Sequence, residues 1–93
     1  MLEMHNPPHP GLLVREWLGT MSVTQAAAKL HISRDTLSRI LHGKSAVSAE
    51  IAIRLAAATG MRPKLWLDLQ AHYDLWQAGQ KSRPRIDPFE RVA

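Results

Sequence analysis

Residues 22–42, SVTQAAAKLHISRDTLSRILH, have the pattern of two short helices joined by a tight turn, and this segment constrains the fold most. Ser22, followed three residues later by Gln25, predicts a capping box at the start of the first helix, and Ser33 predicts the cap of the second. Helices that cross at roughly 90–120° over a short turn bury one face of each. The residues that we expect to face inward together are Ala26, Ala27, Leu30, Ile32, Leu37 and Ile40.

The outward residues of the second helix favour DNA binding. They are hydrogen-bonding side chains that include two Arg and no Glu: Ser33, Arg34, Asp35, Ser38, Arg39 and His42. Such side chains reach base edges or phosphates when their helix lies in a major groove. We expect Ser22 and Gln25 to start the preceding helix close to the DNA backbone, and Lys44 to contact phosphate. The alternative is an ordinary helix pair in a small bundle, which the caps and apolar residues fit equally well.

The charge distribution supports the DNA interpretation. The formal net charge of the 93 residues is +4. Six basic residues lie between positions 29 and 62, against only Asp35 and Glu50. The six are Lys29, Arg34, Arg39, Lys44, Arg54 and Arg62. The sequence therefore predicts a basic patch around the second helix of the pair, as attraction to phosphate requires.

Composition narrows the class of protein. A hydrophobic content of 45% is ordinary for a folded chain, and 93 residues correspond to one domain. The absence of Cys excludes a disulfide framework and a Cys-based zinc site. No run approaches the roughly 20 apolar residues that span a membrane, and no secretion signal is visible. We expect a cytoplasmic protein without a membrane partner.

The remaining sequence predicts three more helices, which makes the fold all-α with five helices. One begins near Pro10, ends before Gly19 and carries Leu13 and Trp17 on one face, with Val14 and Leu18 beside them. Another is capped by Ser48 and runs to about Thr59, and the last spans residues 63–78. Residues 1–8 are predicted to form an N-terminal arm, residues 9–79 the helix-turn-helix domain, and residues 80–93 a tail.

The last helix carries two apolar stripes. One contains Leu65, Trp66, Leu69, Tyr73 and Trp76, and the other contains Leu67, Ala71, Leu75 and Ala78. A surface helix needs one such stripe, so a second stripe indicates a second burial partner, of which a copy of the same chain is the simplest. We predict a homodimer through Leu67, Ala71, Leu75 and Ala78, although the helical wheel leaves the stripes interchangeable. The alternative is that one subunit buries both.

No pattern indicates an enzyme, a cofactor or a metal site. His5 and His9 are separated by a Pro-containing, non-helical segment, so helical ligand spacing does not apply to them. Asp68 and Asp74 point to different sides of their helix and are interpreted as solvated acids. Neither a nucleophile paired with a base nor a Gly-rich phosphate loop is present.

The chain resembles the HigA (also called VapI) family of antitoxins, within the lambda-repressor-like helix-turn-helix proteins. The resemblance is carried by HPGLLVREWL (9–18), residues 22–44, VSAEIAIRLAAATG (47–60) and PKLWLDLQAHYDLWQA (63–78), of which the pattern from Trp66 to Trp76 is the most specific. One position departs from the family pattern. His31 stands in the turn where Gly is usual, and we expect a small stability cost and no change of fold.

This resemblance implies an antitoxin of a type II toxin–antitoxin system. Such a protein neutralises a toxin, a HigB-like mRNA endonuclease, and autorepresses its operon by binding a palindromic operator. The toxin is expected to dock away from residues 33–44, on the terminal segments or the outer face of the first helix. A stand-alone helix-turn-helix transcriptional regulator and a protein-interaction module without DNA binding are the alternatives.

Overall fold

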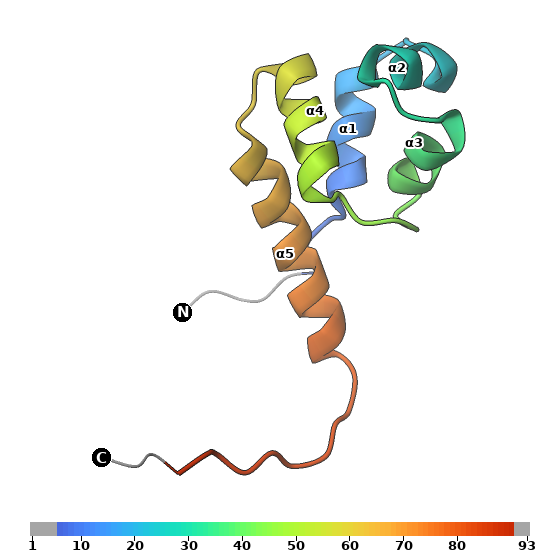
Figure 1. Cartoon of the computed structure of the whole chain (residues 1–93). Helices are drawn as coiled ribbons and strands as arrows, with labels where there is room; N and C mark the ends of the chain where they lie inside the picture. Colours follow the sequence, from blue (N-terminus) through green and yellow to red (C-terminus); the bar gives the residue numbers. More distant parts are fainter. Residues whose placement is uncertain (1–5, 91–93) are drawn as a thin grey trace.

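The computed structural model describes residues 6–90 and contains, within that range, five helices and no strand. The helices are α1 (Pro10–Leu18), α2 (Val23–Leu30), α3 (Arg34–Leu41), α4 (Ala49–Thr59) and α5 (Pro63–Gly79). Figure 1 shows α1–α4 clustered together, with the first half of α5 alongside and its second half projecting away. The all-α prediction and the helix order are confirmed. No helix of the described residues is long and apolar enough to cross a membrane.

Local hydrogen bonds define the helix starts. The Ser22 hydroxyl accepts from the Gln25 N–H at 3.1 Å, and the Gln25 side chain accepts from the Ser22 N–H at 3.2 Å, which completes the predicted capping box. The Ser33 and Ser48 side chains cap α3 and α4 by accepting from the backbone N–H groups of Thr36 and Ile51, without the reciprocal bond. Each cap stabilises the fold by about 1 kcal/mol. The sequence therefore predicted these boundaries from residues close together in the chain.

The core lies between all five helices. Its buried apolar residues are Val14, Ala26, Ala27, Leu30, Leu37, Ile40, Leu41, Val47, Ala52, Leu55 and Trp66. Five of the six predicted inward residues of α2 and α3 are among them, and the sixth, Ile32, is half-buried against this core. Of the apolar residues predicted on α1, Val14 is the buried one, at 1% exposed, whereas Trp17 is 48% exposed. The core-facing side of α1 runs through Gly11, Val14 and Leu18, at helical spacing.

The start of α1 packs directly against the end of α3. A Cβ atom on Gly11 would overlap the carbonyl oxygen of Ile40, so only glycine permits this approach. Arg15 strengthens the same contact by donating from Nη2 to the Leu41 carbonyl at 3.2 Å. Helix α1 therefore fixes the last turn of α3 from behind.

Helix α5 supports the loop that follows α3. Gln70 is 6% exposed, and its Oε1 accepts from the Val47 N–H at 2.8 Å. Its Nε2 donates to Asp74 Oδ1 at 2.9 Å. The interpretation of Asp74 as a solvated acid is incomplete for this reason. The buried amide joins α5 to the α3–α4 loop and satisfies a backbone donor that would otherwise be buried alone.

Candidate nucleic-acid interface

The turn between α2 and α3 holds the two helices at a fixed angle. His31 adopts the left-handed conformation (φ 57°, ψ 43°), as expected for the position where Gly is usual. The His31 N–H donates to the Ala28 carbonyl and the Ile32 N–H to the Ala27 carbonyl, both at 3.1 Å. This pair of bonds is a Schellman motif, which satisfies the final carbonyls of α2.

A guanidinium from α4 completes the turn. Arg54 Nη1 donates to the carbonyls of Leu30 at 3.0 Å and His31 at 2.7 Å. Its Nε donates to Glu50 at 2.9 Å, which orients the side chain. A cation at the carboxyl end of a helix is also favoured by the helix dipole. The i,i+4 spacing of Glu50 and Arg54 was the one sequence signal for this role.

The basic patch is therefore narrower than predicted. Arg34, Arg39 and Lys44 lie on α3 and the loop after it. Arg54 is engaged as a cap, Lys29 lines a pocket between α1, α2 and α4, and Arg62 precedes α5. The prediction that all six cations surround α3 was wrong, because sequence proximity does not report which face a side chain takes.

Each of the two arginines of α3 donates one hydrogen bond within the chain through its Nε–H group. Arg34 Nε donates to Thr24 Oγ1 on α2, and Arg39 Nε donates to Ser45 Oγ in the following loop, both at 3.1 Å. Each of these bonds uses only the Nε–H group of its arginine. The two bonds therefore leave the terminal amino groups available for other acceptors. A guanidinium preoriented in this way is suited to the bidentate recognition of a guanine edge or a phosphate.

The other predicted residues line the same surface or its edge. His42 Nδ1 lies 2.8 Å from the Ser38 carbonyl and donates to it, so this bond does not use Nε2. Asp35 is exposed in the first turn of α3, and Lys44 is exposed in the loop. Ser22, Gln25 and Ser33 are exposed, but their side chains are engaged in the helix caps.

His9 lies behind this surface, and the sequence analysis assigned no specific role to it. Its Nδ1 accepts from the Gly11 N–H at 2.9 Å, which caps α1, and its ring meets Tyr73 of α5 edge-on at 4.9 Å between centroids. Burial lowers the pKa of His9, against the opposing effects of the Ser45 backbone and the Asp74 carboxylate. Its neutral ring thus joins α1, α5 and the loop after α3. The Pro following His9 was the available sequence signal.

The whole surface has the shape and chemistry of a groove reader. A helix about 10–12 Å across fits the DNA major groove, which is about 12 Å wide. Helix α3 presents its polar side, and α2 presents an N-terminus whose first backbone N–H groups, on Val23 and Thr24, lie outside the capping box. Free N–H groups at a helix N-terminus bind phosphate.

Known proteins share this arrangement. The helix-turn-helix family matches residues 13–67. Virulence-associated protein A′ of Dichelobacter nodosus is 43% identical over 86 residues, which cover 89% of this chain and 75% of that protein. An addiction-module antidote protein of the HigA family from Coxiella burnetii has a TM-score of 0.78 and 36% identity, covering 91% of this chain and 100% of that one. Pseudomonas aeruginosa antitoxin HigA, solved with the higBA promoter, has a TM-score of 0.76 and 32% identity, covering 80% and 84%.

Proposed function

The chain belongs to the helix-turn-helix family, in its HigA group, and we propose that it is a dimeric antitoxin that represses its own operon and neutralises a HigB-like mRNA endonuclease. The observation that carries the DNA-binding part is the exposed polar surface of α3, in which two stem-fixed arginines accompany a single acid, Asp35. The promoter complex of the similar HigA supports the same assignment.

Each residue of this interface takes a distinct role. Arg34 and Arg39 are the candidates for base or phosphate recognition, with Ser33, Asp35, Ser38 and His42 beside them. Lys44 neutralises a phosphate beyond the helix. Ser22 and Gln25 act through the cap that positions the start of α2 against the DNA backbone. Base-directed groups supply specificity, and phosphate-directed groups supply salt-dependent affinity.

The exposure of α5 supports dimerisation through the predicted stripe. Leu75 is 70% exposed and Leu67 is 37% exposed, and Ala71 and Ala78 are exposed beside them. The other stripe faces the subunit, with Trp66 fully buried and Leu69 half-buried. A two-fold dimer would present two copies of α3 to an operator with two half-sites.

The toxin requires a surface that operator binding leaves accessible. The outer face of α1 offers Leu12, which is 51% exposed and lies in a shallow apolar pocket with Pro8 and Leu69. This face belongs to a helix that packs behind α3, so one subunit could hold DNA and toxin together. We therefore place the toxin on α1 and on the adjoining terminal segments.

Co-purification with the product of the neighbouring gene tests this function. The full-length chain should retain a small basic toxin, and Leu12→Asp should lose it while keeping operator affinity. Ile53→Asp is the matched control, because Ile53 is 56% exposed on α4, away from the outer face of α1. Operator binding without any retained toxin would instead favour the stand-alone regulator. A wild-type chain that does not bind the operator would favour the protein-interaction module without DNA binding.

A further inference from the structure

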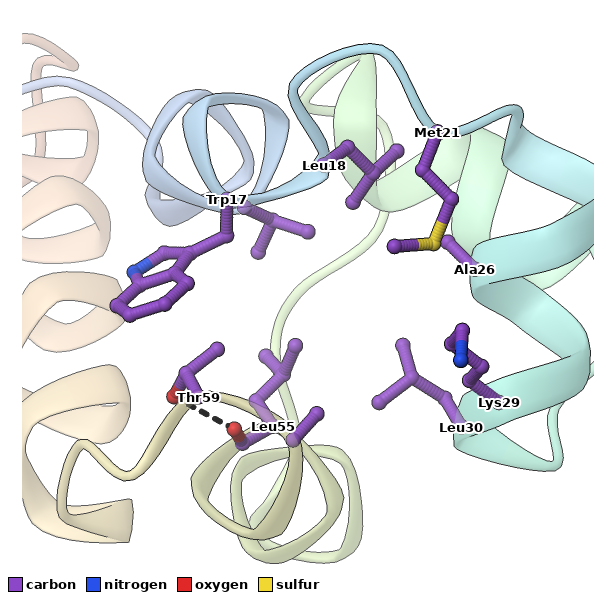
Figure 2. Close-up of a pocket in the computed structure, with 10 residues that line it drawn as sticks. Trp17, Leu18, Met21, Ala26, Lys29, Leu30, Leu55 and Thr59 are labelled. Atoms are coloured by element: carbon purple, nitrogen blue, oxygen red, sulfur yellow. Dashed lines mark hydrogen bonds between the residues drawn. The ribbon is translucent and has the colours of Figure 1, made fainter.

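An apolar pocket opens between α1, α2 and α4, and neither Leu12 nor any residue proposed to contact DNA lines it. Figure 2 shows Trp17, Leu18, Met21, Leu30 and Leu55 around it. Its volume is about 100 Å³. A closed apolar cavity of roughly 150 Å³ takes up benzene. This pocket is smaller but open on one side, so it accommodates part of one large apolar side chain.

The polar groups of the pocket define the charge of its occupant. The Thr59 hydroxyl donates to the Leu55 carbonyl at 2.7 Å, so its proton is already used (Figure 2). Lys29 is the one charged residue among those that line the pocket, and its side chain is exposed. The pocket is therefore complementary to an apolar side chain that is followed or preceded by a carboxylate.

The segment after α5 carries that combination. Residues 82–90 have no regular secondary structure, and all of residues 80–90 are exposed. Phe89 is 100% exposed, with Glu90 directly after it. Ile86 is a second apolar side chain there, 73% exposed. The segment leads away from the body of its own subunit (Figure 1). Two large apolar residues in an otherwise polar, uncovered segment indicate a binding surface outside the subunit.

We propose that Phe89 of one subunit inserts into this pocket of a second copy of the chain, with Glu90 beside Lys29 of the partner subunit. The proposal rests on the proposed dimer through α5. If two α5 helices pair antiparallel with Ala71 opposite Leu75, Gln80 of one subunit lies opposite Trp66 of the other, near the start of α5. The tail then begins beside the partner's pocket, not beside its own.

The distances allow this exchange. Trp66 lies in the first turn of α5, and only residues 60–62 separate the start of that helix from Thr59 at the pocket. The nine residues from Gln80 to Phe89 span up to about 30 Å when extended. On the way, the tail passes a shallow groove lined by Leu13, Trp17 and Met61, which provides apolar contact for Ile86. The tail of the same subunit would have to return along the 17 residues of α5, about 25 Å, before reaching the pocket.

Engineered cysteines provide a direct test, because the chain contains none. Lys29→Cys and Glu90→Cys chains are purified separately, mixed and allowed to exchange subunits, and then oxidised mildly. The expected product is a disulfide between one chain of each kind, identified by mass. The matched control mixes Lys44→Cys with Glu90→Cys, since Lys44 lies on the loop beyond α3. This control should give only background linkage.

A second measurement reports the energy of the contact. Burying a Phe side chain is favourable by about 1.5–3 kcal/mol, so Phe89→Ala should raise the dimer dissociation constant by at least about tenfold. Phe89→Leu keeps an apolar side chain and should retain most of the affinity. Circular dichroism on each variant verifies that the helices are intact.

Three outcomes would overturn the proposal. A chain carrying both cysteines that closes on itself would assign the pocket to its own tail. A stable dimer with no linkage and an unchanged dissociation constant would remove the tail from the interface and leave the proposed function standing. A wild-type chain that light scattering shows to be monomeric would overturn the dimer as well.

Discussion

The surface around α3 and the outer side of α5 differ in how far their side chains are hydrogen-bonded or covered within one chain. Around α3, the helix ends are capped, both arginine stems are hydrogen-bonded, and Gly11 and Arg15 fix the last turn from behind. Along α5, Leu75 and the tail residues Ile86 and Phe89 have no such cover. We propose that the first region binds a rigid ligand and that the second binds another copy of the chain.

This difference shows where the molecule achieves specificity. Recognition of base edges requires side chains held in place before binding, since each flexible side chain that becomes ordered lowers affinity. A subunit interface, in contrast, is stabilised chiefly by apolar area that stays exposed until the partner arrives.

The largest effect should follow Gly11→Ala, which disrupts the contact between α1 and the end of α3. The added Cβ would overlap the Ile40 carbonyl and force α1 away from α3. We expect the free energy of unfolding to fall by about 3 kcal/mol or more in denaturant titrations. Gly79→Ala is the control, because nothing lies within 4 Å of its added Cβ, and it should change stability by less than about 1 kcal/mol. Equal stability of the two variants would mean that α1 does not fix α3.

Leu75→Glu tests the exposed apolar stripe of α5. Leu75 is 70% exposed, so the charged side chain should leave the subunit folded and convert the dimer to a monomer in light scattering. Trp66→Ala should instead lower the free energy of unfolding by about 3–5 kcal/mol, since Trp66 is fully buried. A Leu75→Glu dimer as tight as the wild type would remove this stripe from the interface.

Two substitutions separate reading from attraction on the α3 surface. Arg39→Ala should weaken binding to the chain's own promoter by roughly 1–3 kcal/mol if Arg39 recognises a base. Lys44→Ala should weaken all sequences alike and reduce the dependence of log affinity on log salt by about one unit. Fluorescence titrations at several salt concentrations measure both. Unchanged affinity in both variants would exclude residues 33–44 as the surface that contacts DNA.

The smallest effect concerns His9, which joins the two regions. Because burial lowers its pKa in the folded state, the unfolded chain binds more protons near pH 6.5. Stability from the neutral ring is therefore complete above pH 6.5 and declines as the pH falls towards the lowered value. His9→Asn keeps a cap acceptor without titrating, so its unfolding free energy should depend less on pH between 7 and 5. Identical slopes for both proteins would contradict the buried, neutral ring.

Features that depend on neighbouring residues were predictable. The capping box of Ser22 and Gln25, the caps at Ser33 and Ser48, and the left-handed turn at His31 each involve residues a few positions apart. Apolar periodicity also identified the inner faces of α2 and α3. The proposed interface residues follow from the same pattern and remain predictions.

Features that require distant elements to meet were not predictable. Arg54 reaches carbonyls 23 and 24 residues away, and Gln70 binds a backbone N–H that is 23 residues away. Gly11 is required because α1 crosses the end of α3, a contact that no local pattern encodes. The partial exposure of Trp17 was not predictable for the same reason. A helical pattern indicates the direction of a side chain but not which element packs against it.

Stoichiometric titration of the chain's own promoter DNA shows how many chains bind one operator. Sedimentation or light scattering of the complex should give two chains on an operator whose half-sites are related by two-fold symmetry. Their centres should lie about one helical turn apart, or a multiple of one. Leu75→Glu should abolish the complex of two chains and retain weaker binding of one chain to a single half-site. A tight complex containing one chain, or a site without two-fold symmetry, would contradict the account.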